Sequence, residues 1–253
     1  MHWRKTPTGL HASGRELFAM GKKDMKLYWG SGSQPCFRVM IALHEKGFGG
    51  IDMKQIIFSE NGHKCDEIMV KNHRGQVPTF NDGDKIVNES MAICLYLEKA
   101  YPNEGTKLLP DDPAKFAKVI QTAIEAQENL NMKLLINCVY IAWTTSAADK
   151  EGEEYKSRMK AGLEGAKKEL EIWEGKLKKS AGEFICGETF TLADVVLFVF
   201  VATAVRFGNN LANLPTLRTY YDTLSNRDSI KASWPPHWKD GDLEQSKQVL
   251  RDM

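Results

Sequence analysis

The alternation of strand and helix patterns over residues 25–104 is the feature that most constrains the fold of this chain. Short apolar stretches with branched or aromatic side chains alternate with stretches whose apolar residues recur at helical spacing. In chain order, these patterns lie at 26–29, 36–46, 53–58, 66–70, 79–80, 85–87 and 90–101. The turn sequence NDGD at 81–84 joins the last two strands into a hairpin. A βαβ unit followed by a hairpin and a helix predicts a small α/β domain around a mixed four-stranded sheet.

From residue 113 onward, the sequence shows only helical patterns. They lie at 113–145, 151–179, 191–205 and 214–226. We therefore expect a domain boundary after residue 104, a proline-containing linker at 105–112 and an all-helical domain, a helical bundle, over 113–253. The third pattern is almost wholly apolar, and Thr191 and Asp194 are placed as a capping box at its start. It is expected to form the buried central helix.

Charge and cysteine content exclude several classes of protein. The net charge of +1 gives no electrostatic reason to expect binding to nucleic acid or to an anionic membrane. The longest apolar run, 195–205, is shorter than the ~18 residues that a membrane span needs. The cysteines are odd in number, widely spaced and without metal-ligand spacing, which argues against disulfides or a bound metal and for the reducing cytoplasm.

Residues 1–24 differ from the rest of the chain. They show little apolar periodicity and lack the apolar segment of a secretion signal. Arg4, Lys5 and Arg15 would suit a weak mitochondrial-type leader. We expect instead a disordered or vector-derived extension, with the fold starting near Met25.

Ser33 lies in the sequence SGSQPC, between the first strand and the first helix. Unpaired N–H groups and the macrodipole make a helix N-terminus favourable for negative charge. Three roles fit a serine here: a helix cap, a nucleophile, or a hydrogen-bond donor to the thiolate of a substrate. A redox dithiol is excluded because Ser33 stands where the first cysteine would be, three residues before Cys36.

Two further stretches of the first domain suit a peptide-like ligand. If the bond between Val77 and Pro78 is cis, the Val77 backbone is turned outward, free to pair with such a ligand. Glu89 and Ser90 open a helix, where they can hold the ammonium and the carboxylate of an α-amino acid. Each stretch also has a simple structural reading, as a loop proline and as a helix cap.

His63 and Lys64 lie in a polar loop and can pair with a second carboxylate, or they can simply be solvated. Taken together, the predicted sites would accept an amino-acid head, a peptide-like middle, a thiol and a distal carboxylate. That combination of groups is the shape of glutathione.

From Met25 to about Trp238, the chain resembles the cytosolic glutathione transferases. The motifs that carry the resemblance are LYWGSGSQPCFRV, NGHKCDEIMVKNHRGQVPTF, NESMAICLYLE, FTLADVVLF and SIKASWPPHW. The last motif, together with the WGSGS opening, is most similar to the rho class of fish and aquatic invertebrates. The overall pattern is also similar to the theta, delta and phi classes, which use serine.

The resemblance implies a thioredoxin-like N-terminal domain, an all-helical C-terminal domain and a homodimer. It implies conjugation of glutathione, as co-substrate, to small hydrophobic electrophiles such as xenobiotics and lipid-peroxidation products. Ser33 matches the serine whose hydroxyl donates to the glutathione sulfur. The other glutathione-binding residues that it implies are His63, Lys64, Gln76, Val77, Pro78, Glu89 and Ser90.

Some alternatives stay open at the level of sequence. Ser31 or Tyr28 can replace Ser33 as the hydroxyl that meets the sulfur. A non-catalytic ligand-binding protein of the same fold and a glutathione-dependent peroxidase are the competing functions. We expect the electrophile pocket between the two domains, at Met132, Tyr140, Arg206, Phe207, Trp234 and Trp238.

Overall fold

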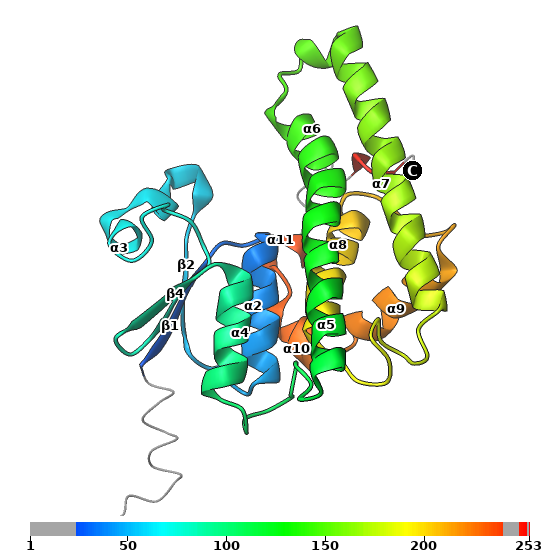
Figure 1. Ribbon diagram of the computed structural model, residues 1–253. Coiled ribbons are helices and arrows are strands. Elements are labelled where there is room, and N and C mark those ends of the chain that lie inside the picture. Colours follow the sequence, from blue (N-terminus) through cyan, green and yellow to red (C-terminus); the bar gives the residue numbers. More distant parts are fainter. Residues whose placement is uncertain (1–23, 240–247, 252) are drawn as a thin grey trace, which may run out of the picture.

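The computed structural model describes residues 24–239, 248–251 and 253 (Figure 1). All but the last residue of the predicted N-terminal extension therefore lies outside the described part of the chain. The N-terminal elements are β1 (Met25–Trp29), α2 (Gln34–Glu45), β2 (Asp52–Gln55), η1 (Phe58–Glu60), η2 (Gly62–Lys64), α3 (Asp66–Met69), β3 (Thr79–Asp82), β4 (Lys85–Asn88) and α4 (Ser90–Ala100). The C-terminal elements are α5 (Pro113–Glu125), η3 (Ala126–Tyr140), α6 (Ile141–Thr144), η4 (Asp149–Glu151), α7 (Glu153–Lys178), α8 (Leu192–Arg206), α9 (Pro215–Ser225), α10 (Asp228–Ser233) and α11 (Pro236–Lys239).

The sheet has the strand order β2-β1-β3-β4. β1 pairs in parallel with β2 and antiparallel with β3, and β3 and β4 form an antiparallel hairpin. The predicted mixed four-stranded sheet is therefore confirmed. It lies at the edge of the molecule away from the helical domain, with α2 and α4 between the two (Figure 1).

Residue alternation along β1 decides which side chains meet which helices. Leu27 and Trp29 belong to the large core that includes α2 and α4, whereas Tyr28 points to the other face and packs with Ile56 and Ile68. Successive side chains of a strand point to opposite faces, so one strand serves both layers. This geometry removes Tyr28 from the side of the sheet that faces the helical domain.

One long helical rod, Pro113–Thr144, begins the C-terminal domain and matches the predicted 113–145. It starts as α5, with Asp112 as N-cap accepting from the Lys115 N–H at 2.8 Å. It continues without a break through the π-helical segment η3 and ends as α6. Figure 1 shows this rod running the length of the molecule beside α2 and α8. π-Helical turns are rare and are frequently found at functional sites.

The core of the helical domain is α8, whose residues from Leu192 to Ala204 are buried. Its capping box is present as predicted: the carboxylate of Asp194 accepts from the N–H and the hydroxyl of Thr191 at 2.8 and 2.9 Å. The same carboxylate accepts from the Ile185 N–H at 2.9 Å and the Tyr220 hydroxyl at 3.1 Å. No helix in the described part of the chain is long and apolar enough to cross a membrane.

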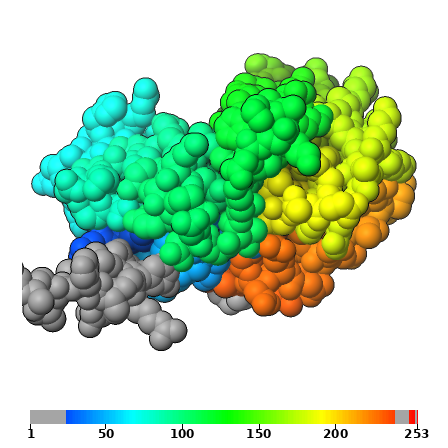
Figure 2. Space-filling view, turned by 60° about the horizontal axis from the view of Figure 1, so that its bottom comes forward, coloured from blue at the N-terminus to red at the C-terminus, as the bar shows by residue number. Residues whose placement is uncertain are grey.

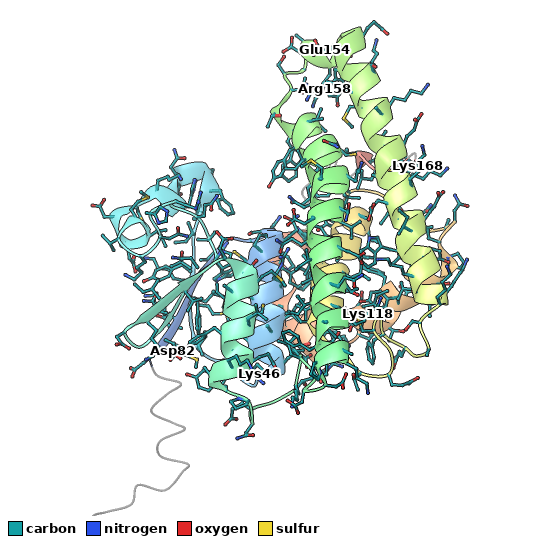
Figure 3. The ribbon with its side chains drawn as sticks, viewed as in Figure 1. Lys46, Asp82, Lys118, Glu154, Arg158 and Lys168 are labelled. Carbon is teal, nitrogen blue, oxygen red and sulfur yellow. The ribbon has the colours of Figure 1, made fainter. Side chains whose placement is uncertain are left out.

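Buried ion pairs join the C-terminal end of α2 to its surroundings. Glu45 accepts two hydrogen bonds from the Arg227 guanidinium, at 2.6 and 2.8 Å, just before α10. Lys46, labelled at the foot of α2 in Figure 3, pairs with Glu98 of α4 at 3.1 Å. Figure 2 shows the two domains as adjoining masses, coloured cyan to teal and green to orange.

Candidate active site

A cavity of about 710 Å³ lies between the two domains. The N-terminal domain supplies mainly polar lining, and the helical domain supplies mainly apolar lining. Its lining residues are Ser31, Gly32, Ser33, Gln34, Pro35, Arg38, Phe58, His63, Asn72, Gln76, Val77, Pro78, Glu89, Ser90, Gln127, Asn131, Leu135, Val139, Tyr140, Trp143, Phe200, Phe207, His237 and Trp238. Seven of the eight predicted glutathione-binding residues belong to this set, and the eighth, Lys64, does not.

Ser33 is the N-cap of α2. Its hydroxyl oxygen accepts a 3.4 Å hydrogen bond from the Cys36 N–H, and Pro35 occupies the first turn, where a missing N–H costs nothing. The hydroxyl also carries a proton, which it can donate either to the Cys36 sulfur or to a negative atom in the cavity. A negative atom placed here would meet the start of the α2 macrodipole as well as the hydroxyl. The cap and the donor role are therefore compatible in one residue.

The bond between Val77 and Pro78 is cis, and both residues line the cavity. The loop before it is held by Asn72, whose side-chain amide donates to the Gln76 carbonyl at 3.0 Å. The Thr79 hydroxyl donates to the same carbonyl at 2.9 Å. These bonds fix the backbone of the loop that leads into the cavity wall.

Glu89 and Ser90 lie at the start of α4 and close the polar end of the cavity. Ser90 is buried, Glu89 is exposed, and Glu89 has φ 65°. A non-glycine residue in this left-handed region is uncommon, and such strain clusters at ligand sites. The conformation carries the chain directly from β4 into α4 and leaves the first N–H groups of α4 at the cavity, where they can hold a carboxylate.

His63 lines the cavity, but its neighbour Lys64 does not. The His63 ring lies 5.6 Å from the Phe58 ring, and its buried Nδ1 has no hydrogen-bond partner among the described residues. The Lys64 ammonium instead donates to the Arg74 carbonyl at 2.7 Å. In this structure, therefore, only the first of the two predicted partners of a distal carboxylate is in place.

The structure separates the alternatives to Ser33. The Tyr28 hydroxyl donates to Glu67 at 2.8 Å outside the cavity lining, and burial, together with that carboxylate, raises the pKa of Tyr28 to about 12. Ser31 does line the cavity, but its Oγ is 2.6 Å from Nδ1 of His237. A hydroxyl engaged with imidazole is less free to meet a thiolate than that of Ser33.

Cys36 is fully buried in the core beneath the cavity. Burial raises the pKa of the Cys36 thiol to about 11, against smaller opposing effects of hydrogen bonds from Ser33 and Gly30. A thiol in this environment is a poor nucleophile because the thiolate is the reactive form. Cys36 is therefore a packing residue, consistent with the exclusion of a redox dithiol.

Of the six residues predicted for the electrophile pocket, Tyr140, Phe207 and Trp238 line the cavity. Met132, Arg206 and Trp234 do not, and each placement has a physical reason. Met132 follows Asn131 on η3, so the helical turn carries it to the outside, where it is 49% exposed. Trp234 packs edge-on against Phe37 at 5.9 Å. The Arg206 guanidinium donates to the carbonyls of residues 237 and 238, at 3.4 and 3.3 Å, and so holds α11 in place.

Sequence reasoning missed several lining residues because they come from distant segments. Gln127, Asn131 and Trp143 lie on the long rod. The only feature of the sequence that groups them is their spacing by four residues or a multiple of four, which places them on one side of the helix. His237 comes from α11, more than 200 residues after Gly32. Gly32 has φ 79°, and a Cβ there would be 2.6 Å from Cε1 of His237, so both the backbone and the close approach require glycine.

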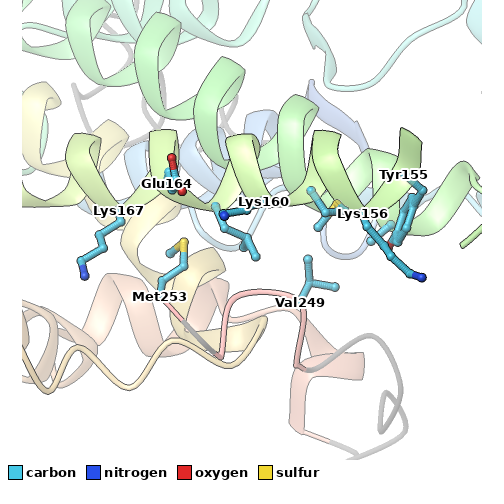
Figure 4. A pocket seen from close by; sticks show the side chains of 10 residues that line it. Tyr155, Lys156, Lys160, Glu164, Lys167, Val249 and Met253 are labelled. Carbon is cyan, nitrogen blue, oxygen red and sulfur yellow. The ribbon is translucent and has the colours of Figure 1, made fainter. Parts of the chain in front are cut away.

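A second hollow of about 570 Å³ lies between α7 and the C-terminal segment. Figure 4 shows Lys156, Lys160 and Lys167 of α7 facing Val249 and Met253 across it. None of the predicted site residues lines this hollow, so the cavity between the domains is the candidate active site. The described residues contain no group of His, Cys, Asp and Glu side chains that could hold a metal ion.

Comparisons with known proteins agree with this architecture. A family model for the glutathione S-transferase N-terminal domain matches residues 27–105, and one for the C-terminal domain matches residues 138–233. The chain is 42% identical over 231 residues to glutathione S-transferase A of the fish Pleuronectes platessa, covering 91% of this chain and 99% of the relative. It is 32% identical over 178 residues to a glutathione S-transferase of Hyoscyamus muticus, covering 68% of this chain and 78% of that relative.

Among solved structures, a glutathione S-transferase of the Antarctic clam Laternula elliptica is 38% identical. It superposes with a TM-score of 0.78, covering 91% of this chain and 99% of the clam protein. The fold, the cavity and these relatives define a two-domain protein with a thioredoxin-like N-terminal domain. The chain belongs to the glutathione S-transferase family.

Proposed function

We propose that the chain is a serine-type glutathione transferase that conjugates the glutathione thiolate to small hydrophobic electrophiles. The observation that carries the proposal is Ser33, a hydroxyl at the N-terminus of α2 that opens onto a cavity with polar and apolar halves. Xenobiotics and products of lipid peroxidation are the electrophile classes that we propose. The family relatives named above support the reaction class.

Hydrogen bonding and the helix macrodipole supply enough free energy to ionise the bound glutathione thiol without a general base. A free thiol has a pKa near ~8.5, so only a few per cent is thiolate at neutral pH. Lowering the pKa of the bound thiol to about 6–7 requires ~2–3 kcal/mol of preferential binding of the thiolate. A hydroxyl donor to an anion supplies ~1.5–3 kcal/mol, and a helix N-terminus supplies up to ~1–2 kcal/mol. Ser33 and α2 together provide both.

The polar half of the cavity would hold the rest of glutathione. Ser90 and the N-terminus of α4 would bind the α-carboxylate of the γ-glutamyl group, and Glu89 its ammonium. The Val77 backbone before Pro78 would pair with the cysteinyl unit, while Gln76 and His63 would meet the glycine end. Lys64 would need to leave the Arg74 carbonyl in order to join them.

The apolar half would place the electrophile against the sulfur. Tyr140, Phe207 and Trp238 offer aromatic surfaces around this half. With an aryl chloride, the thiolate attacks the ring carbon, a C–S bond forms, and chloride leaves with the electron pair of the C–Cl bond. The thiol proton is released to solvent when the thiolate forms, so no oxidant or reductant is needed. Fixed orientation supplies most of the remaining rate enhancement.

Four finer statements belong to the same proposal. The chain is most similar to the rho class, and it forms a homodimer. It acts in the cytoplasm, a reducing compartment in which free cysteines such as the five here persist. The two domains divide at residues 105–112, between α4 and α5. Chromatography coupled to light scattering would test the homodimer, since a mass near that of one chain would contradict it.

The first experiment is the pH dependence of glutathione conjugation to 1-chloro-2,4-dinitrobenzene by the wild type and Ser33→Ala. We expect an apparent pKa well below that of free glutathione for the wild type. In Ser33→Ala, the pKa should rise and turnover at neutral pH should fall by about tenfold or more, with little loss of glutathione affinity.

Ser31→Ala is the matched control, since Ser31 lines the cavity two residues away. A Ser33→Ala enzyme with unchanged turnover and pKa would reduce Ser33 to a helix cap and make Ser31 the candidate. A wild type that binds glutathione but conjugates no acceptor at any pH would show that the fold serves binding only.

A further inference from the structure

Arg38 is a buried cation on the wall of the candidate active site. It lies on α2 one turn after Gln34, on the side of the helix that faces the other domain. Its side chain contacts that domain twice: the guanidinium donates to Oε1 of Gln127 on η3 and lies 5.7 Å from the centre of the Phe200 ring on α8. Only 2% of the residue is exposed.

The charge of Arg38 is not balanced by the protein around it. No carboxylate within the described ranges forms an ion pair with it, and its buried Nε has no hydrogen-bond acceptor there. Burial lowers the pKa of the guanidinium to about 10, so it stays charged at neutral pH. A buried charge without a counter-ion is costly, and the cost is offset when an anion binds beside it.

The position of Arg38 distinguishes its task from those of the glutathione-binding residues. Ser33 and the α2 N-terminus serve the sulfur, and Ser90 and His63 lie on the N-terminal domain. Arg38 instead reaches across from α2 to Gln127 of the helical domain, which supplies the mainly apolar lining of the cavity. A ligand for this half therefore needs an apolar body and one negatively charged oxygen group.

We propose that Arg38 selects electrophiles that carry a carboxylate, which it binds together with Gln127 at the junction of α2 and η3. The inference rests on the proposed conjugation reaction and adds its substrate preference. Guanidinium and carboxylate form paired, charge-assisted hydrogen bonds, and the free Nε supplies a second donor beside a terminal nitrogen. The carboxylate takes no part in bond making, so the reaction itself is unchanged.

Two acceptors of nearly equal size test the preference in the wild type. One is 4-chloro-3-nitrobenzoate, which is anionic, and the other is 4-chloro-3-nitrobenzamide, which is neutral. For each, kcat/KM is divided by the rate constant of the uncatalysed reaction with glutathione at the same pH. This correction removes the difference in intrinsic reactivity. We expect the corrected value for the benzoate to exceed that for the benzamide by tenfold or more.

The variants Arg38→Met and Arg38→Lys then assign the preference to one side chain. Arg38→Met should bring the ratio of the corrected values close to one, mainly by loss of benzoate turnover, with benzamide turnover within about threefold of wild type. Arg38→Lys should retain part of the ratio, since an ammonium keeps the charge but not the paired geometry. Arg218→Met, which removes an exposed guanidinium on α9, is the matched control and should behave like the wild type.

A measurement that needs no variant covers the case in which Arg38→Met fails to fold. The two reaction products, the glutathione conjugates of the benzoate and of the benzamide, are compared as inhibitors of the wild type. Tighter inhibition by the carboxylate conjugate, by tenfold or more, supports the proposal. Equal inhibition contradicts it.

The outcomes separate this inference from the proposed function. If the wild type conjugates both acceptors with equal corrected efficiency, the transferase function stands and the role of Arg38 is wrong. If Arg38→Met lowers both activities equally, Arg38 acts on the thiolate or on packing, and its proposed role in selecting carboxylates is again wrong. If the wild type conjugates neither acceptor nor 1-chloro-2,4-dinitrobenzene, the proposed function itself fails.

Discussion

Glu89 shows how much a single residue contributes to the shape of the polar end of the cavity between the domains. Its left-handed backbone costs on the order of 1–3 kcal/mol, which surrounding structure must offset. The carboxylate itself stays exposed at the mouth of the cavity. This combination suits a residue kept in place for what it binds rather than for what it packs against.

Replacing Glu89 with Gln should weaken glutathione binding by about tenfold, because a charge-assisted hydrogen bond to the ammonium is lost. The midpoint of urea unfolding should stay unchanged, since the backbone and the size of the side chain are kept. Calorimetric titration with glutathione measures the affinity, and Glu104→Gln, on the loop after α4, is the control. An affinity equal to that of the wild type would contradict the ammonium role.

The sequence allowed prediction of residues whose role depends on local order along the chain. Ser33 follows a strand and precedes a helix, and Ser90 opens another, so their positions at helix N-termini follow from short patterns. Arg38 and His237 escaped prediction for a different reason. Their importance depends on contacts with Gln127 and Ser31, which lie 89 and 206 residues away in the chain.

Among the elements, α8 depends most clearly on one carboxylate. Asp194 satisfies donors from the turn before the helix, from Thr191 at its start and from Tyr220 on α9. Buried donors without acceptors each cost ~1–3 kcal/mol. The capping box is therefore also a link between α8 and α9.

We expect Asp194→Ala to lower the free energy of unfolding by about 3 kcal/mol or more, and Thr191→Ala by about 1 kcal/mol. Urea unfolding at neutral pH measures both, with Thr219→Ala, an exposed hydroxyl on α9, as the control. A loss below about 0.5 kcal/mol for Asp194→Ala would show that the donors find other acceptors.

Element boundaries were predictable where side-chain periodicity is strong and not where it is short. The rod from Pro113 ends at Thr144, one residue before the predicted end, but its π-helical segment was not expected because apolar spacing does not separate π from α turns. The second strand ends at Gln55 rather than at residue 58, because Phe58 already belongs to the 3₁₀-helix η1. The short helices α10 and α11 carry too few residues to show a period.

For the whole molecule, the ion pair of Glu45 with Arg227 is a charged link between the two domains. Burial alone would raise the pKa of its carboxyl, but hydrogen bonds from Arg227, Ser229 and Thr106 outweigh burial and lower it. A lowered pKa means that the ionised form stabilises the folded protein. This contribution is present above the pKa of the unfolded chain, near ~4.3, and is lost as the pH falls through the lower folded-state value.

Glu45→Gln should therefore cost about 1–3 kcal/mol of stability at pH ~7 and progressively less as the pH falls below ~4. Urea unfolding of both proteins across this range gives the difference at each pH. A difference that stays constant down to pH ~3 would show that charge at Glu45 does not join the domains. Glu104→Gln serves again as the control.

The contact between α11 and the loop at Gly32 has a consequence for how the protein is made. The ribosome synthesises Gly32 early and His237 more than 200 residues later, yet the two pack together. A nascent chain can fold its sheet and still lack the wall that Trp238 provides. The complete cavity therefore requires contact between two segments that lie more than 200 residues apart in the chain.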